Sequence, residues 1–290
     1  MKVILSSCCV GALLVPGVSG FTLLNVFGDS LSDIGNTAEV ARPEGYAPGR
    51  FSNGPVYVEQ LGYPMRPSLE GGNNYAVGGA RVRDGVGSLV AQIEAFQTRN
   101  PAGVPERTAS ILFIGGNDLR AAAMDPPNAQ AMAGDALAGI SEAILDLRGA
   151  GVSFILVPNL PDLSILPELN SATDFERQGV SVLTRFWNDS LQAMVDSFRA
   201  PEVQVFDTFT LFEEILADPM GFGFKTTGEP AISSPGDDEE FLFWDEVHPS
   251  AAMHRVLAQR IRETTPVPEP SFTLLFGMTL GLLGRRQRVQ

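Results

Sequence analysis

The sequence predicts an α/β fold in which helices cover both faces of a parallel sheet. Apolar runs of strand length alternate with segments of helical periodicity, which is the order that βαβ units require. Two of these runs, residues 109–114 and 152–157, are nearly continuous in apolar residues, as is typical of strands buried on both faces. Polar residues follow the ends of several runs, and we expect them to share one edge of the sheet.

The elements can be placed in order from periodicity and capping signals. Leu89, Ile93 and Phe96 lie on one face of a helix, and Thr173 with Glu176 forms a capping box for a later one. The expected strands are residues 23–28, 74–80, 109–114, 152–157 and 203–206. The expected helices are residues 56–61, 89–99, 132–149, 173–195, a short helix after Asp207, and 250–264. The sequence shows neither a repeat nor an internal linker, so residues 21–265 are expected to form one domain.

The first strand ends abruptly at Gly28, and Asp29-Ser30 opens a segment able to start a helix. Unpaired backbone amides at a helix start can hold negative charge, so a serine there is a candidate reacting group. Serine is also a common helix cap. The residues alone leave both interpretations of Ser30 open.

Two long loops stand out between the periodic segments. Residues 35–73 are irregular and rich in Gly, Pro and Asn, and loops of this length usually carry function or line a site. Residues 218–240 are loop-like and end in an acidic tip that includes Asp237 to Glu240. The tip could bind a cation, but its spacing does not match an EF-hand loop, and a solvated surface turn is favoured.

Composition excludes one class of partner. Hydrophobic residues make up 44% of the chain and charged residues 19%, which allows a sizeable core and argues against global disorder. Without residues 1–20 and 266–290, 16 basic and 33 acidic residues remain, for a net charge of −17. Such a body repels nucleic acid and anionic membrane surfaces, so nucleic-acid binding is excluded.

The first twenty residues have the pattern of a secretory signal peptide. Lys2 supplies the positive start, residues 3–15 are almost wholly apolar, and residues 18–20 are small enough for cleavage. Both cysteines, Cys8 and Cys9, lie in this segment. The mature chain would then contain no cysteine, which excludes disulfides, thiolate chemistry and cysteine-bound zinc.

Only two histidines occur in the chain, His248 and His254. Asp245 precedes His248 by three residues, and Pro249 prevents a helix from continuing through this point. A carboxylate at that spacing can accept a hydrogen bond from one ring nitrogen and leave the other free to act as a base. Taken alone, Asp-x-x-His is also a common surface pair. His254 is expected on the following helix as a surface or packing residue.

Together, the polar blocks resemble the GDSL, or SGNH, hydrolase family over about residues 23–261. The blocks are Gly28-Asp29-Ser30-Leu31-Ser32-Asp33, Gly79, Gly115-x-Asn117-Asp118 and Asp245-x-x-His248-Pro249. Residues 50–55 and 74–80 are most similar to its phospholipase or lecithinase-like esterase branch. The resemblance implies a three-layer α/β/α sandwich with a flavodoxin-like, five-stranded parallel sheet of strand order 2-1-3-4-5.

The same resemblance implies roles for five residues. Ser30 would be the nucleophile, His248 the general base and then acid, and Asp245 the orienting carboxylate. The amides of Ser30 and Gly79 and the side-chain amide of Asn117 would form the oxyanion hole. A serine does need an adjacent base, and a tetrahedral oxyanion needs donors placed in advance. The mature chain has no G-x-S-x-G, which argues against an ordinary α/β-hydrolase, and the resemblance implies no metal or organic cofactor.

The C-terminal residues 266–290 resemble a bacterial PEP-CTERM sorting signal, which an exosortase processes during export. Val267-Pro268-Glu269-Pro270-Ser271 precedes an apolar run at residues 272–283 and a basic end. The run is short for a stable membrane span, and the basic end fits a cytoplasmic stop. A C-terminal core helix is the alternative, which the two prolines disfavour. We expect transient association with the inner membrane, followed by a cell-surface or extracellular location.

The sequence therefore predicts an exported serine esterase or lipase that cleaves carboxylic esters through an acyl-enzyme. Lipids, acetylated glycans and small esters are all candidate substrates. The same site would support acyl transfer to an alcohol other than water. A noncatalytic surface or matrix protein on the same fold is the alternative of another class, and the complete set of five site residues argues against it.

Overall fold

The computed structural model describes residues 20–37, 45–234 and 238–265. The predicted sorting signal, residues 1–19 of the predicted signal peptide, and residues 235–237 of the acidic loop lie outside this part of the chain. Those assignments stay predictions. Within the described residues, no helix combines the length and the apolar character needed to cross a membrane.

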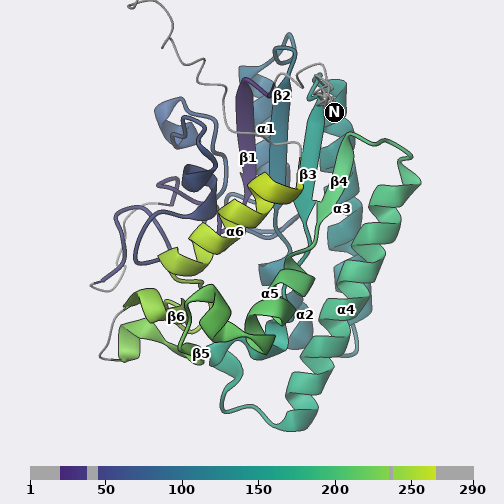
Figure 1. The fold of residues 1–290 in the computed structure, drawn as a ribbon. Coiled ribbons are helices and arrows are strands. Elements are labelled where there is room, and N and C mark those ends of the chain that lie inside the picture. Colours follow the sequence, from purple (N-terminus) through teal and green to yellow (C-terminus); the bar gives the residue numbers. More distant parts are fainter. Residues whose placement is uncertain (1–19, 38–44, 235–237, 266–290) are drawn as a thin grey trace, which may run out of the picture.

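The centre of the fold is a parallel sheet, as predicted (Figure 1). Its strands are β1 (Leu23–Gly28), β2 (Thr108–Phe113), β3 (Phe154–Pro158) and β4 (Val203–Phe206), in that order across the sheet. Every residue of β2 and β3 is buried, which explains why these two runs are almost wholly apolar. The carboxyl ends of all four strands point to the same edge.

The predicted strand at residues 74–80 is reduced to an isolated bridge between Asn74 and Val26 on the free side of β1. This segment takes the place expected for the second strand, but the sheet has four strands rather than five. Three backbone hydrogen bonds still join the segment to β1: the Val26 amide donates to the Asn73 carbonyl, and the Tyr75 and Val77 amides donate to the carbonyls of Val26 and Gly28. The Asn74 side chain accepts from the Ala76 amide, and the Asn36 amide donates to the carbonyls of Asn74 and Ala76.

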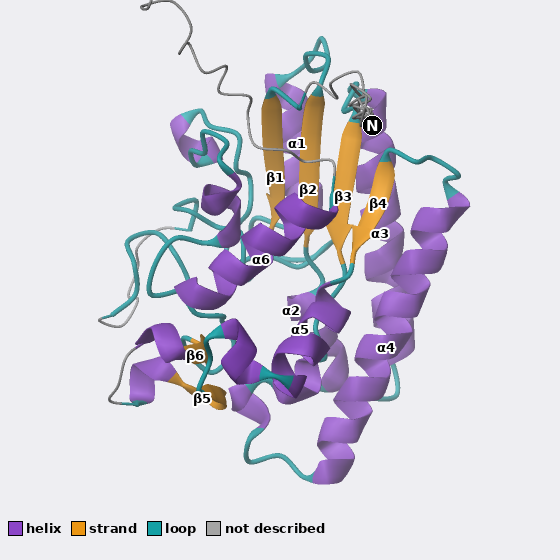
Figure 2. Cartoon of the chain, viewed as in Figure 1, coloured by secondary structure: helices purple, strands orange, loops and turns teal. Residues whose placement is uncertain are grey.

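Helices lie on both faces of the sheet (Figure 2). One face carries α6 (Ala251–Thr264), and behind the sheet lie α1 (Leu89–Arg99) and α3 (Ala129–Gly149). The remaining α-helices are α2 (Gly116–Ala123), α4 (Asp174–Ser197) and α5 (Thr208–Ala217). The predicted capping box at Thr173 and Glu176 is present, and Asp207 and Ser250 cap α5 and α6. The fold is thus the predicted α/β class, with α2 as a helix that the sequence did not predict.

The segment expected to be a loop at residues 218–240 contains more structure than predicted. It holds β5 (Thr226–Pro230), which pairs in parallel with β6 (Phe241–Phe243) to form a separate two-stranded sheet. Short 3₁₀ helices occur at Pro219–Phe222, Ala231–Ser233 and Asp238–Glu240 here, and at Tyr57–Leu61, Ser68–Glu70, Leu163–Ile165 and Pro167–Leu169 elsewhere. The single short helix predicted at residues 56–61 is therefore a 3₁₀ helix.

Two glycines allow the strand ends to approach their neighbours. Gly28 has φ +156°, and a Cβ there would lie 2.3 Å from the Phe113 carbonyl oxygen of β2. Gly115 has φ +117°, and a Cβ there would lie 2.2 Å from the buried ring of Trp187. Because no side chain fits at either point, both turns that follow β1 and β2 require glycine.

Candidate active site

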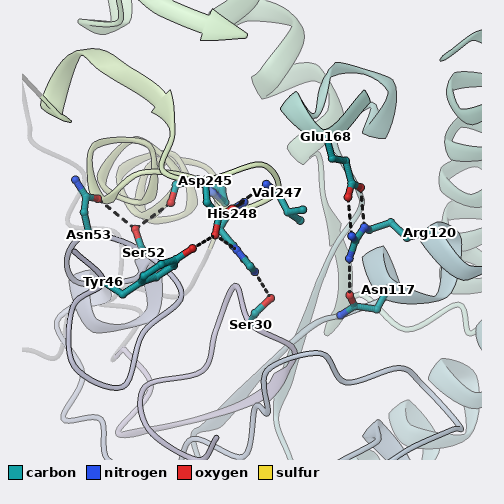
Figure 3. Close-up of polar contacts among 11 residues, drawn as sticks. Ser30, Tyr46, Ser52, Asn53, Asn117, Arg120, Glu168, Asp245, Val247 and His248 are labelled. Atoms are coloured by element: carbon teal, nitrogen blue, oxygen red, sulfur yellow. Dashed lines mark hydrogen bonds and ion pairs between the residues drawn. The ribbon is translucent and has the colours of Figure 1, made fainter. Parts of the chain in front are cut away.

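A chain of hydrogen bonds joins Ser30, His248 and Asp245 at the carboxyl edge of the sheet (Figure 3). The Ser30 Oγ lies 2.9 Å from His248 Nε2, and His248 Nδ1 lies 2.7 Å from Asp245 Oδ2. The structure therefore brings together three residues that the sequence analysis singled out, two of them 218 positions apart.

Ser30 lies in a single turn after β1 and not at the start of a helix, so the predicted helix there is wrong. The Asp33 amide donates to the Asp29 carbonyl, which closes one turn. The Asp33 carboxylate then accepts from the amides of Gly35, Asn36 and Thr37, and these bonds replace helical ones. As a result, the interpretation of Ser30 as a helix cap also fails.

A residue that the sequence did not single out fixes the end of β1. Gln92 on α1 is buried, its Oε1 accepts from the Gly28 amide at 2.9 Å, and its Nε2 donates to the Gly28 carbonyl at 2.7 Å. These two bonds satisfy both backbone groups of Gly28, two residues before Ser30.

The loop that carries Asp245 and His248 is held by the carboxylate itself. Asp245 Oδ1 accepts from the amides of Val247 at 2.8 Å and His248 at 2.6 Å. The second oxygen, Oδ2, faces His248 Nδ1 and also accepts from the Tyr46 hydroxyl at 2.6 Å. Burial alone would raise the pKa of Asp245, but the hydrogen bonds and charge of His248 and the bond from Tyr46 lower that pKa to about 2. Asp245 is therefore a carboxylate at neutral pH.

The charge on Asp245 decides which nitrogen of His248 carries the proton. A carboxylate can only accept, so His248 Nδ1 donates to it and Nε2 is left to accept from the Ser30 hydroxyl. The ring of Phe51 lies against the imidazole, with 5.2 Å between ring centroids. Both Tyr46 and Phe51 come from the long loop after Ser30, in which the sequence predicted functional residues without identifying them.

The three expected oxyanion donors differ in whether they already form hydrogen bonds. Neither the Ser30 nor the Gly79 backbone N–H donates to another group within the described part of the chain. Asn117, in the first turn of α2, uses one side-chain N–H to bond the Ala80 carbonyl at 3.0 Å. This bond ties the Gly79-Ala80 turn to α2. The other side-chain N–H of Asn117 has no partner among the described residues.

An ion pair that the sequence analysis missed adjoins Asn117 (Figure 3). Arg120 binds Glu168 through two hydrogen bonds, of 2.7 and 2.6 Å, in the bidentate arrangement. Its third nitrogen donates to Asn117 Oδ1 at 3.4 Å, which is long but orients the amide. The Glu168 amide in turn donates to the Glu246 carbonyl at 3.0 Å. The pair therefore links α2, which bears Asn117, to the loop that bears Asp245 and His248.

Asp29 and His254 are buried beside the site. Burial raises the pKa of Asp29 to about 7, against a bond from the Leu31 amide that lowers it. His254 is 1% exposed and accepts from the Tyr57 amide at 3.3 Å, so of the two expected roles it has the packing one. Burial lowers the pKa of His254 to about 3, which keeps the ring neutral.

A pocket opens beside Ser30 and is walled mainly by apolar side chains. It encloses about 710 Å³ of space between atoms, a figure that includes the open solvent at its mouth. Ser30, Asn117 and His248 line it, while Gly79 does not.

Within the described residues, no three His, Cys, Asp or Glu side chains gather in a group that could hold a metal ion. The described end of the acidic tip is engaged in ion pairs. Glu239 pairs with Arg255 and Glu240 with Lys225, which is the arrangement of a solvated surface segment.

Comparisons with known proteins identify a family. The family model of the GDSL-like lipase/acylhydrolases matches residues 24–261. The chain is 27% identical over 270 residues to the thermolabile hemolysin of Vibrio parahaemolyticus, covering 82% of the chain but only 62% of the hemolysin. It is 27% identical over 307 residues to the phosphatidylcholine-sterol acyltransferase of Aeromonas hydrophila, covering 82% of the chain and 88% of that protein.

A solved structure is similar in fold. The structure of LAE5, an α/β hydrolase enzyme from the metagenome of Lake Arreo in Spain, matches with a TM-score of 0.50 at 17% identity, covering 86% of this chain and 97% of LAE5. At that identity the likeness concerns the fold alone.

Proposed function

The chain belongs to the GDSL-like lipase/acylhydrolase family, and we propose that it hydrolyses carboxylic esters through an acyl-enzyme formed on Ser30. The observation that carries the proposal is the unbroken hydrogen-bond chain from Ser30 Oγ through His248 to Asp245, with distances of 2.9 and 2.7 Å. Asp245 is a carboxylate at neutral pH, as the orienting role requires.

The proposed reaction has two steps. His248 Nε2 takes the Ser30 proton as Oγ attacks the ester carbonyl carbon, and the imidazolium then gives that proton to the departing alcohol. Water attacks the acyl-enzyme in the second step, with His248 again taking a proton, and the carboxylic acid leaves as Ser30 recovers its hydrogen. Asp245 stays ionised and stabilises the imidazolium, as its low pKa requires.

The proposed oxyanion hole consists of the Ser30 and Gly79 amides and the free N–H of Asn117. Two observations support it: the two backbone donors have no partner among the described residues, and the Asn117 amide is oriented by bonds at both of its ends. A donor that is already oriented stabilises the developing charge without further reorganisation. Arg120 then acts as a positioning residue for Asn117.

Labelling by an organophosphonate tests the nucleophile directly. We expect one phosphonyl group per chain, on Ser30, and none on a Ser30→Ala variant. Ser32→Ala is a matched control, because Ser32 is buried and its hydroxyl bonds to Tyr57 at 3.0 Å. A chain that folds but takes up no label would support the noncatalytic binding protein instead.

Acyl transfer is a second candidate, and the likeness to an acyltransferase from Aeromonas hydrophila favours it. The acyl-enzyme would then pass its acyl group to an alcohol in place of water. Hydrolysis assays run with and without added alcohols or glycosides would separate the two, since transfer produces a new ester at the expense of free acid.

We further propose that the protein is exported and processed, on the strength of the sequence alone. Residues 1–20 would be removed as a signal peptide, residues 21–265 would form the hydrolase domain, and residues 266–290 would hold the chain at the inner membrane until an exosortase cuts it. The mature enzyme would then be at the cell surface or outside the cell.

A further inference from the structure

One segment of the long loop after Ser30, residues 46–53, lies against residues 245–251, which include the proposed base (Figure 3). Both hydrogen bonds and ring packing join the two segments. The contacts are a bond of 2.9 Å from the Ser52 hydroxyl to the Pro249 carbonyl, a bond of 2.8 Å from the Ala251 amide to Asn53 Oδ1, and the packing of the Phe51 ring on the His248 imidazole. The first segment therefore fixes the position of the second.

A further contact between these segments reaches the carboxylate of Asp245 itself. The Tyr46 hydroxyl donates to Asp245 Oδ2 at 2.6 Å, and the same oxygen faces His248 Nδ1 at 2.7 Å. The other oxygen, Oδ1, accepts from the amides of Val247 and His248. A carboxylate has about four sites that can accept a hydrogen bond, so all the sites of Asp245 are occupied.

Two donors on one oxygen share its charge. The bond from Tyr46 draws negative charge on Oδ2 toward the hydroxyl, so that oxygen attracts a protonated His248 ring less strongly than it would without the bond. The neutral ring is the form that can take the proton of Ser30. The Tyr46 hydroxyl therefore favours the working form of the base, and it also holds Oδ2 in line with Nδ1.

We propose that Tyr46 is a positioning residue that acts through Asp245 and extends the activity of the enzyme to lower pH by keeping His248 neutral. Tyr46 contacts the carboxylate and not the reacting atoms. The effect on activity rests on the proposed function, whereas the effect on the protonation of His248 can be measured without any turnover.

Other ionisable groups also face this pair, from elements outside the Tyr46 segment. They are Asp29 after β1, His254 on α6 and Arg120 on α2, with the exposed Glu246 next to Asp245. A Tyr46→Phe variant keeps every one of these groups. A difference between the variant and the wild type therefore reports the hydroxyl of Tyr46 and not the titration of a neighbour.

The test is the titration of the His248 ring by NMR in the full chain, wild type and Tyr46→Phe. Only two histidines occur in the chain, and burial lowers the pKa of His254 to about 3, so the two ring signals are readily told apart. A full opposite charge moves a titration by about one to three units, and a neutral donor does less. We therefore expect the midpoint for His248 to rise by roughly half a pH unit in the variant.

The acid limb of kcat/KM on p-nitrophenyl acetate should move to higher pH by the same amount. A role limited to packing would lower kcat/KM equally at every pH and leave both curves in place. The Tyr46→Phe chain should fold, because the substituted ring can keep the edge-on contact with Trp244, whose ring centroid lies 5.7 Å from that of Tyr46.

Tyr63→Phe is the matched control. The Tyr63 hydroxyl donates to the Phe21 carbonyl at 3.3 Å, ahead of β1 and so at the opposite end of that strand from Ser30. Its loss should leave the His248 titration and the acid limb unchanged.

A second measurement asks whether Tyr46 acts through Asp245. In an Asp245→Ala background, Tyr46→Phe should neither move the His248 titration nor lower kcat/KM further, because the shared oxygen is gone. A shift that persists in this background overturns the proposed route through Asp245.

The outcomes separate this inference from the proposed function. Superimposable His248 titrations in the wild type and Tyr46→Phe, in a protein whose Ser30 takes the phosphonate, overturn the role of Tyr46 alone. A Ser30 that takes no phosphonate and turns over no ester overturns the proposed function, and the effect of Tyr46 on activity with it.

Discussion

Replacement of Asp29 by asparagine should stabilise the protein at alkaline pH and leave it unchanged in acid. Burial raises the pKa of Asp29 to about 7 from an ordinary value of 3.8. Between about pH 4 and 7, the Asp29 carboxyl therefore carries a proton in the folded chain but not in the unfolded chain. The stability contributed by the protonated form is complete below the unfolded pKa and is lost as pH rises through the folded one.

The size of the effect follows from the shift. A difference of about three pKa units corresponds to roughly 4 kcal/mol of unfolding free energy, lost in the wild type by pH 8. The substituted asparagine side chain would carry no charge at any of these pH values, and its oxygen can still accept from the Leu31 amide, which lies 3.0 Å from Oδ1 of Asp29 in the wild type. The variant should therefore be more stable than the wild type by several kcal/mol at pH 8 and nearly equal to it at pH 4.

Urea denaturation from pH 4 to pH 9 measures this difference, with the fluorescence of the two tryptophans as the signal. Asp189→Asn is the matched control, because Asp189 is an exposed carboxylate on α4. The unfolding free energy of the Asp189→Asn variant should match that of the wild type at every pH. An Asp29→Asn advantage that is absent at pH 8, or equally large at pH 4, would refute the reasoning.

Three further predictions concern catalysis and processing. Ser30→Ala and His248→Ala should each abolish most ester hydrolysis, and the double variant should be little worse, because the residues act as a unit; a folded, fully active Ser30→Ala protein would exclude the assignment. Asn117→Ala should lower kcat by about 10²–10³, and Arg120→Met should lower kcat less, with little change in KM. Combining the last two changes should add little, whereas additive losses would show that Arg120 does not act through Asn117. A chain of residues 21–265 should be as active as the full chain, and mass spectrometry of protein released at the host cell surface should find no peptide from residues 272–285.

Local patterns predicted most of the fold. The helix at residues 89–99 and the capping box at Thr173 depend on neighbours within one or two turns, and both are present as predicted. The helix after Ser30 was wrong because the buried Asp33 side chain binds the backbone amides that a helix would use, and the strand expected at Asn74 is an isolated bridge to Val26. Secondary-structure propensity does not show whether such a side chain will be buried and will bind the backbone.

In the site, too, contacts between residues close in sequence could be predicted and contacts between distant residues could not. Asp245 and His248 are three residues apart, so the sequence alone could suggest their pairing. The bonds from Tyr46 to Asp245, Gln92 to Gly28 and Arg120 to Glu168 join residues 199, 64 and 48 positions apart. No local spacing marks such pairs, and only the packed fold shows them.

The long separation of Ser30 and His248 also has a consequence for the order of folding. The nucleophile follows the first strand, whereas the base precedes α6, 218 residues later, and α6 packs against the 3₁₀ helix at Tyr57–Leu61. Closing so long a loop is entropically costly, so contacts of this kind form late in folding. During refolding, activity should therefore return after the helical and sheet signals have recovered. A fragment that ends before His248 would present a nucleophile without its base, however completely its sheet had formed.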